Sequence, residues 1–79
     1  MVGYELTGLD DKKVTYNYYP ENDLNNKGVI SFDRKNNKPF VASRAVDDEY
    51  GFYSIHMFNM LRKSNETGNF EKTGYIAWY

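Results

Sequence analysis

His56 is the single histidine of this 79-residue chain, and histidine is the side chain that most often moves protons at neutral pH. Two runs of carboxylates, Asp10-Asp11 and Asp47-Asp48-Glu49, are the other candidates for acid–base chemistry. The first run suits a hairpin turn, and the second suits the start of a helix, where negative charge is favoured. Helical spacing places His56 outside the apolar side of the predicted helix, as an exposed residue. We therefore predict no catalytic residue and no enzyme.

Metal and cofactor chemistry finds equally little support. The chain contains no cysteine, so neither thiolate metal sites nor disulfides are available. Residues 23–28 resemble the start of an EF-hand calcium loop, but Lys27 stands at the third ligand position and Arg34 at the twelfth, where a glutamate is required. No glycine-rich phosphate loop precedes a helix. We predict neither a metal nor a cofactor.

Protein binding is the function that we rank first. On the predicted helix, Phe52 and Ile55 fall outside the core-facing arc, and His56 and Asn59 lie beside them. Large apolar groups ringed by polar groups are typical of binding patches. The alternative is that residues 67–73 cover this side of the helix and make both apolar side chains part of the core. The same patch, or an exposed edge strand, would also serve self-association.

Single-stranded nucleic-acid binding is the second function that the sequence leaves open. Arg34, Lys35 and Lys38 gather at one predicted hairpin tip, and an outward-facing Tyr19 suits stacking on an unpaired base. The formal net charge of −1 argues against it, because non-specific affinity for nucleic acid comes mostly from phosphate neutralisation. A solvated hairpin tip is the simpler explanation, so this function is the alternative.

These candidates depend on an α+β fold with the element order ββββαβ. Apolar alternation, strand-forming residues and turn signals predict strands at 2–7, 14–19, 29–32, 40–46 and 74–79. From residue 47 the apolar spacing changes to every third or fourth position, which predicts a helix that begins there, capped by Asp47 or Asp48, and ends near Ser64 before Gly68. We expect one domain, with this amphipathic helix packed on one face of a largely antiparallel sheet of four to five strands.

Aromatic residues make up 18% of the chain and have to build most of its core. A domain of this size buries only about 60% of the surface that its unfolded chain exposes, whereas each buried ring removes roughly 150 to 250 Å² from water. The core-facing arc predicted for the helix contains Val46, Tyr50, Tyr53, Ser54, Met57, Phe58, Met60 and Leu61.

Three segments of the chain resemble a set of small proteins from Gram-positive bacteria and their phages. They are Tyr18-Tyr19-Pro20-Glu21-Asn22, Asp48-Glu49-Tyr50 and residues 74–79, Gly-Tyr-Ile-Ala-Trp-Tyr. The resemblance implies a mobile-element source and an accessory role, and it assigns no activity, cofactor or catalytic residue. The sequence has no basic segment followed by a long apolar run and no membrane-spanning stretch, so we expect a cytoplasmic protein and no membrane partner.

Overall fold

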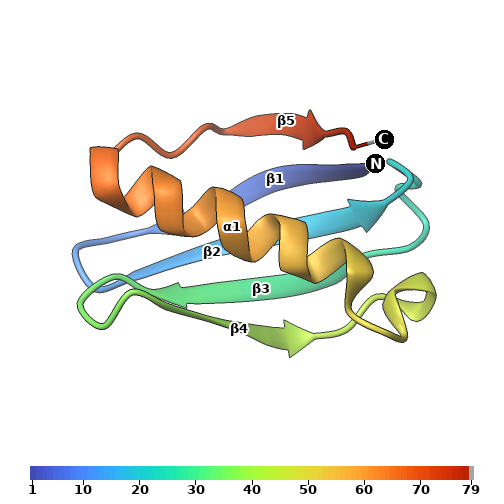
Figure 1. Ribbon diagram of the computed structural model, residues 1–79, viewed down its shortest axis with the longest axis horizontal. Coiled ribbons are helices and arrows are strands. Elements are labelled where there is room, and N and C mark those ends of the chain that lie inside the picture. The colour runs from blue at the N-terminus through green and yellow to red at the C-terminus, as the bar shows by residue number, and fades with distance from the viewer. Residues whose placement is uncertain (79) are drawn as a thin grey trace.

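The computed structural model describes residues 1–78, which form one five-stranded sheet and one α-helix (Figure 1). The elements are β1 Val2–Leu9, β2 Lys13–Pro20, β3 Gly28–Asp33, β4 Lys38–Ser43, the 3-10 turn η1 Val46–Asp48, α1 Phe52–Thr67 and β5 Thr73–Ile76. The predicted order ββββαβ is therefore confirmed.

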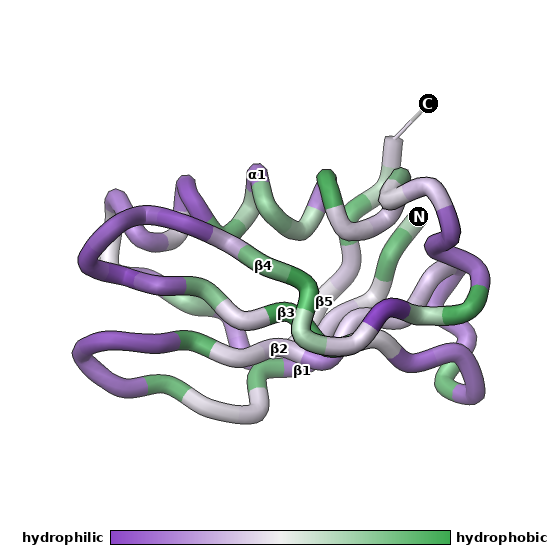
Figure 2. Tube along the Cα trace, turned by 90° about the horizontal axis from the view of Figure 1, so that it is seen from below, coloured by the Kyte–Doolittle hydropathy of each residue, from purple (hydrophilic) through white to green (hydrophobic). Residues whose placement is uncertain are grey.

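The sheet has the strand order β4-β3-β2-β1-β5, and every neighbouring pair is antiparallel. β4 and β5 are its two edges, and α1 runs across one face from the end of β4 to the beginning of β5 (Figure 1). Figure 2 shows α1 on one side of the sheet and, within residues 1–78, no element across the other side. We call this uncovered side the open face. The predicted α+β class, antiparallel sheet and packed helix are confirmed.

Alternate residues of the strands form the core between the sheet and α1. The buried apolar residues are Val2, Val14, Tyr16, Tyr18, Ile30, Phe32, Ala45, Met57, Leu61 and Phe70. Met57 and Leu61 come from α1, and Phe70 comes from the segment before β5. Because burial of each large apolar side chain contributes roughly 1.5 to 3 kcal/mol, the period-two pattern that forms the strands also stabilises the fold.

Two tyrosines in this core need hydrogen-bond partners for their hydroxyl groups. Tyr16 donates to the backbone oxygen of Glu71 at 2.5 Å, and Tyr18 donates to the carboxylate of Asp48 at 2.7 Å. Burial raises the pKa of both hydroxyls from 10.0 to about 12, because a phenolate in this place would lose its hydration. The fold thus depends on both tyrosines being neutral.

Alkaline pH is expected to destabilise the fold through Tyr16 and Tyr18. A tyrosine with a higher pKa in the folded chain contributes its full stability below the unfolded pKa, near 10, and loses it as the pH rises towards the folded pKa. We expect the free energy of unfolding to fall by about 2 kcal/mol for each tyrosine between pH 10 and pH 12. Urea unfolding at a series of pH values measures this loss. Tyr16→Phe is the control, because it should remove about half of the pH dependence; a flat profile for the wild type would contradict the prediction.

The helix begins five residues later than predicted, at Phe52 instead of residue 47. Residues 46–48 form η1, and Gly51, with a φ of 76°, then turns the chain into α1. Glycine adopts this left-handed backbone without the steric cost that other residues carry. The acidic run therefore precedes the helix and does not form its first turn.

The late start corrects part of the predicted core-facing arc. Val46 and Tyr50 precede the helix and are 87% and 78% exposed, so their assignment to the core is wrong. The other members of the arc are buried or half-buried against the sheet: Tyr53, Ser54, Met57, Phe58, Met60 and Leu61. Helical spacing was thus correct for the members of the arc that lie in α1.

The ends of the later elements also differ from the sequence prediction. α1 ends at Thr67, three residues beyond the predicted end near Ser64. Gly68 is its C-cap, with a φ of 77° and an N–H that donates to the backbone oxygen of Ser64 at 2.8 Å, as the glycine signal predicts. β4 ends at Ser43 instead of residue 46, because the chain turns inward there to bury Ala45. β5 covers Thr73–Ile76, and Tyr79, in the predicted closing strand, lies outside the described residues. No helix among residues 1–78 has the length and apolar character needed to cross a membrane.

Candidate interaction surfaces

One buried carboxylate, that of Asp48, fixes the start of α1. Its Oδ1 accepts the N–H of Tyr53 at 2.9 Å, and its Oδ2 accepts the N–H of Ser54 at 3.3 Å. The same Oδ2 accepts the Tyr18 hydroxyl and lies 3.6 Å from Nη1 of Arg44. Asp48 therefore accepts hydrogen bonds from the first turn of the helix, as predicted, and ties that turn to the central strand β2.

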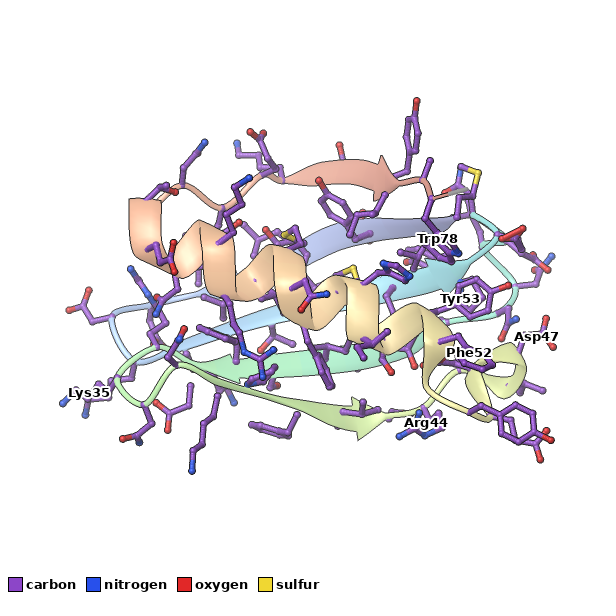
Figure 3. All side chains as sticks on the ribbon, in the orientation of Figure 1. Lys35, Arg44, Asp47, Phe52, Tyr53 and Trp78 are labelled. Carbon is purple, nitrogen blue, oxygen red and sulfur yellow. The ribbon has the colours of Figure 1, made fainter. Side chains whose placement is uncertain are left out.

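Four large, exposed apolar side chains lie between residues 46 and 55, on either side of Asp48 in the sequence, and we call them the apolar end. They are Val46, Tyr50, Phe52 and Ile55, with exposed fractions of 87%, 78%, 68% and 53%. The rings of Tyr50 and Phe52 lie 6.1 Å apart and are tilted by 47°. Figure 3 shows Phe52 near Arg44 and Asp47, at the end of the molecule opposite Lys35. Single exposed apolar residues are ordinary, but such a group within one short segment is typical of an interaction surface.

Carboxylates line the rim of the apolar end. Asp47 and Glu49 are exposed on either side of buried Asp48. Burial, followed by the charge of Glu21, raises the pKa of the Tyr53 hydroxyl, but this third carboxylate is already paired with the N-terminal amine of Met1 at 2.7 Å, so the rim charge comes from Asp47 and Glu49. The neighbouring cation, Arg44, is already paired with Asp48. The rim therefore offers negative charge to a binding partner.

Three of the four predicted partner-binding residues are exposed on the outer side of α1: Phe52, Ile55 and Asn59. Residues 67–73 do not cover them, so the alternative in which Phe52 and Ile55 belong to the core is wrong. Val46 and Tyr50, which complete the surface, were not predicted because helical spacing assigned them to the core-facing arc.

The fourth predicted residue, His56, has different surroundings. Its ring stacks on Trp78 with centroids 3.9 Å apart and an interplanar angle of 10°. Tyr53 packs edge-on against the same indole at 5.7 Å. His56 is half-buried and not the exposed histidine that helical spacing predicts, because the chain beyond β5 places Trp78 beside it. It supports the packing next to the apolar end.

The predicted nucleic-acid residues are not brought together. Tyr19 and Lys13 lie near opposite ends of β2, roughly 20 Å apart at the rise of a strand. Asp33 pairs with Lys13 on one side and with Lys38 on the other, so Lys38 belongs to the end far from Tyr19. Tyr19 does face away from α1, as predicted, but in a different part of the open face.

Arg34 is not available as a phosphate contact either. Its Nη1 donates to the backbone oxygen of Asp10 at 2.9 Å, and its Nε donates to Oδ1 of Asn65 at 3.3 Å. The guanidinium also lies 5.1 Å from the centroid of the Phe70 ring. Arg34 therefore joins two turns to the end of α1, and its inclusion in a cationic tip needs correction.

An aromatic side chain that was not among the predicted residues accompanies the remaining lysines. Phe40 on β4 is 51% exposed, and its pairing with Ser31 places it on the open face. A pocket of about 390 Å³ is lined by Lys12, Lys13, Asp33, Lys35, Asn36 and Phe40. We call Lys12, Lys13, Lys35 and Lys38 the lysine cluster. The sequence signal for part of it is the spacing of Lys38 and Phe40, which share one face of a strand.

A further pocket, of about 320 Å³, lies at the Tyr19 end of the open face. It is lined by Tyr4, Glu5, Tyr19, Asn22, Leu24, Thr73 and Gly74. The Tyr19 hydroxyl lies 3.5 Å from Oε1 of Glu5, and Asn17 donates to that hydroxyl at 3.4 Å. Because Glu5 is the charged residue of this lining, the pocket does not suit an anionic ligand.

The loop that resembles an EF-hand is held by its own hydrogen bonds. Oδ1 of Asp23 accepts the N–H of Asn25 at 3.0 Å, and Nδ2 of Asn26 donates to Asp47 at 2.6 Å. Within residues 1–78, no group of three or more histidine, aspartate or glutamate side chains is placed to hold a metal ion. These side chains have structural roles in the loop.

Comparisons of the chain with family models, with curated proteins and with solved structures find no match. The resemblance to small proteins of Gram-positive bacteria and their phages stays a prediction. Since no relative supplies a residue role, the function has to be argued from the surfaces themselves.

Proposed function

We propose that the chain is a protein-binding module and that the apolar end is its contact surface. One observation carries the proposal: four large apolar side chains expose 53% to 87% of their surface within the segment from residue 46 to residue 55. Covering them would contribute roughly 25 cal/mol for each Å² of apolar surface removed from water. Two of the four are aromatic, the kind of residue that most often dominates a protein interface.

The contact surface is held in place before a partner arrives. Asp48 fixes the first turn of α1, and the N–H of Ile55 donates to the backbone oxygen of Gly51 at 3.0 Å. Phe52 and Ile55 therefore project from a helix whose start cannot shift without breaking buried hydrogen bonds. A surface ordered in advance loses less conformational entropy on binding.

The partner that fits best is a segment that combines apolar and basic side chains, such as one face of an amphipathic helix. Asp47 and Glu49 would face its basic groups across the rim, which favours association. Two copies of this chain in a symmetric dimer would instead place these carboxylates near each other. Charge thus favours a different protein over self-association, and a regulatory role of this kind suits an accessory protein of a mobile element.

Replacing Phe52 and Ile55 together with serine is expected to weaken binding to such a segment by about 100-fold or more. Both side chains are more than half exposed, so the free energy of unfolding should change by less than about 1 kcal/mol. Peptides selected from a random library on the wild-type protein provide the ligands. Fluorescence anisotropy then gives the Kd of each peptide for the wild type and for the double variant.

Leu9→Ser is the matched control, because Leu9 is 51% exposed at the end of β1 and lies outside the apolar end. It should leave peptide binding unchanged, and the selected peptides should be rich in basic and apolar residues. Equal affinity of the double variant and the wild type would show that the apolar end is not the contact surface. A wild-type dimer that the double variant does not form would replace the proposed partner with a second copy of the chain.

A further inference from the structure

The open face of the sheet carries a second surface, far from the apolar end and different in its chemistry. Phe40 lies on this face, 51% exposed, with the hydroxyls of Ser31 and Thr15 beside it in the pairing register. Lys12 and Lys35, from the two neighbouring hairpin turns, and Lys13, from the start of β2, line the pocket beside Phe40, and Lys38 of β4 pairs with Asp33 of the same lining. We propose that this end of the open face binds single-stranded nucleic acid, with a base stacked on Phe40 and phosphates held by the lysine cluster.

The side chains that would hold the ligand converge on one pocket. Its volume is about 390 Å³, and its lining includes Phe40, Lys12, Lys13 and Lys35. Asp33 separates Lys13 on β2 from Lys38 on β4 in the register, so cations stand on both sides of it. One aromatic ring with cations around it is the combination that proteins use to bind unpaired nucleotides.

The charges at this site are available to a ligand. The four lysines are exposed, and the ion pairs found within residues 1–78, Met1 with Glu21 and Arg44 with Asp48, involve none of them. Asp33 accepts hydrogen bonds from the side chain and the N–H of Asn36 and from the N–H of Lys35. The bond from the Asn36 side chain, followed by that from the Asn36 N–H, lowers the pKa of Asp33 from 3.8. Its oxygens are thus directed to the turn.

The turn between β1 and β2 holds two of the lysines in place. Oδ1 of Asp10 accepts the N–H of Lys12 at 2.8 Å and the N–H of Lys13 at 2.7 Å. Asp11, exposed in the same turn, lowers the net positive charge of the site. We therefore expect moderate affinity that depends strongly on salt.

The shape of the surface favours a single strand over a duplex. Reading a duplex requires an element that enters a groove, and the open face presents none within residues 1–78. An exposed ring on a sheet offers a stacking platform for a base that is not paired. Bases that continue along this face would pass the polar side chains of Thr15 and Asn17 and stop short of the Glu5 carboxylate beside Tyr19.

A fluorescent oligothymidylate of about 12 nucleotides, within the range of about 4 to 16 that one OB-fold binds, tests the proposal. Titration at rising salt concentrations should give affinity that falls with salt, with a slope of about 0.7 for each phosphate contact. Lys13→Ala with Lys35→Ala should weaken binding about tenfold or more at low salt and reduce the slope by about 1.4. Phe40→Ala should weaken binding about tenfold with the slope unchanged, and Phe40→Trp should restore it.

Lys27→Ala with Lys63→Ala is the charge-matched control, because both lysines are exposed and lie outside the cluster. This control should bind as the wild type does. Absence of salt-dependent binding would overturn the proposal. Tighter binding to duplex DNA than to the single strand would also overturn it. Heparin or anionic vesicles that bind as tightly as the oligonucleotide, with no effect of Phe40→Ala, would show a general polyanion surface and overturn it as well. The apolar end takes no part in this test, so its outcome is independent of the proposed protein partner.

Discussion

Replacing Asp48 with alanine is expected to lower the free energy of unfolding by about 4 kcal/mol. The carboxylate is 1% exposed and accepts hydrogen bonds from the Tyr18 hydroxyl and from the N–H groups of Tyr53 and Ser54. Alanine would leave three donors without acceptors in a place closed to water, at a cost of about 1 to 3 kcal/mol each. Urea unfolding followed by circular dichroism measures the loss.

Two further variants serve as controls for the Asp48→Ala prediction. Glu49→Ala removes the same charge from the next residue, whose side chain is exposed, and should change the free energy of unfolding by less than about 0.5 kcal/mol. A domain of this length has only about 4 to 12 kcal/mol of stability in total, so at the low end of this range Asp48→Ala would leave no folded population to measure. Asp48→Asn retains one acceptor oxygen and should give an intermediate loss. If Asp48→Ala costs no more than Glu49→Ala, the buried carboxylate does not hold the helix start.

Replacing Gly28 with alanine is expected to cost about 3 kcal/mol of unfolding free energy. The new Cβ would lie 2.2 Å from Cε1 and 2.4 Å from Cζ of the Tyr18 ring, far inside any contact distance. The ring cannot turn away, because it is fully buried and its hydroxyl both donates to Asp48 and accepts the N–H of Ala45 at 3.1 Å. Either β3 moves away from β2 or the buried hydrogen bonds break. Chemical unfolding of the variant and the wild type gives the difference.

Two other strand glycines provide controls for Gly28. A Cβ at Gly8 meets nothing closer than Cβ of Thr15 at 3.8 Å, so Gly8→Ala should be neutral or slightly stabilising, since alanine restricts the unfolded chain. A Cβ at Gly74 would lie 2.5 Å from the Tyr4 hydroxyl, but Tyr4 is only half-buried and can shift, so an intermediate loss is expected. Equal effects at positions 28 and 8 would contradict the described packing.

The strands and their faces could be predicted from the sequence because side chains alternate with a period of two. Val14, Tyr16 and Tyr18 share one face of β2, and all three are fully buried. The same rule puts Ile30 and Phe32 on one face of β3, and both are fully buried in the core. Together with the change to helical spacing after residue 46, this alternation predicts the element order ββββαβ, and that order does not depend on which strands pair.

The start of the helix could not be predicted from spacing alone. The acidic run of residues 47–49 would stabilise a helix that begins there, and an angular pattern does not distinguish a 3-10 turn from the first turn of an α-helix. The informative residue was Gly51, because its left-handed backbone separates the two segments. Because of this error, Val46 and Tyr50 were assigned to the core and not to the candidate interaction surface.

The rest of both surfaces depends on contacts between distant segments. Spacing on the helix correctly exposed Phe52 and Ile55, because that question concerns one element only. The neighbours of Phe40 come from three strands and two turns, so they follow from the strand order, which the sequence does not state. The stacking of His56 on Trp78 likewise depends on where the chain goes after β5.

The pairing of β1 with β5 has a consequence for how this protein folds during translation. Val2 pairs with Ile76 and Glu5 pairs with Thr73, so a strand made early finds its second neighbour in the strand made after all other described elements. A nascent chain can form the β1-β2-β3-β4 meander first, but one backbone edge of β1 stays open until β5 leaves the exit tunnel. Neighbouring nascent chains on one messenger would meet with that edge unprotected, which makes the interval before β5 emerges a time of high risk of misassembly.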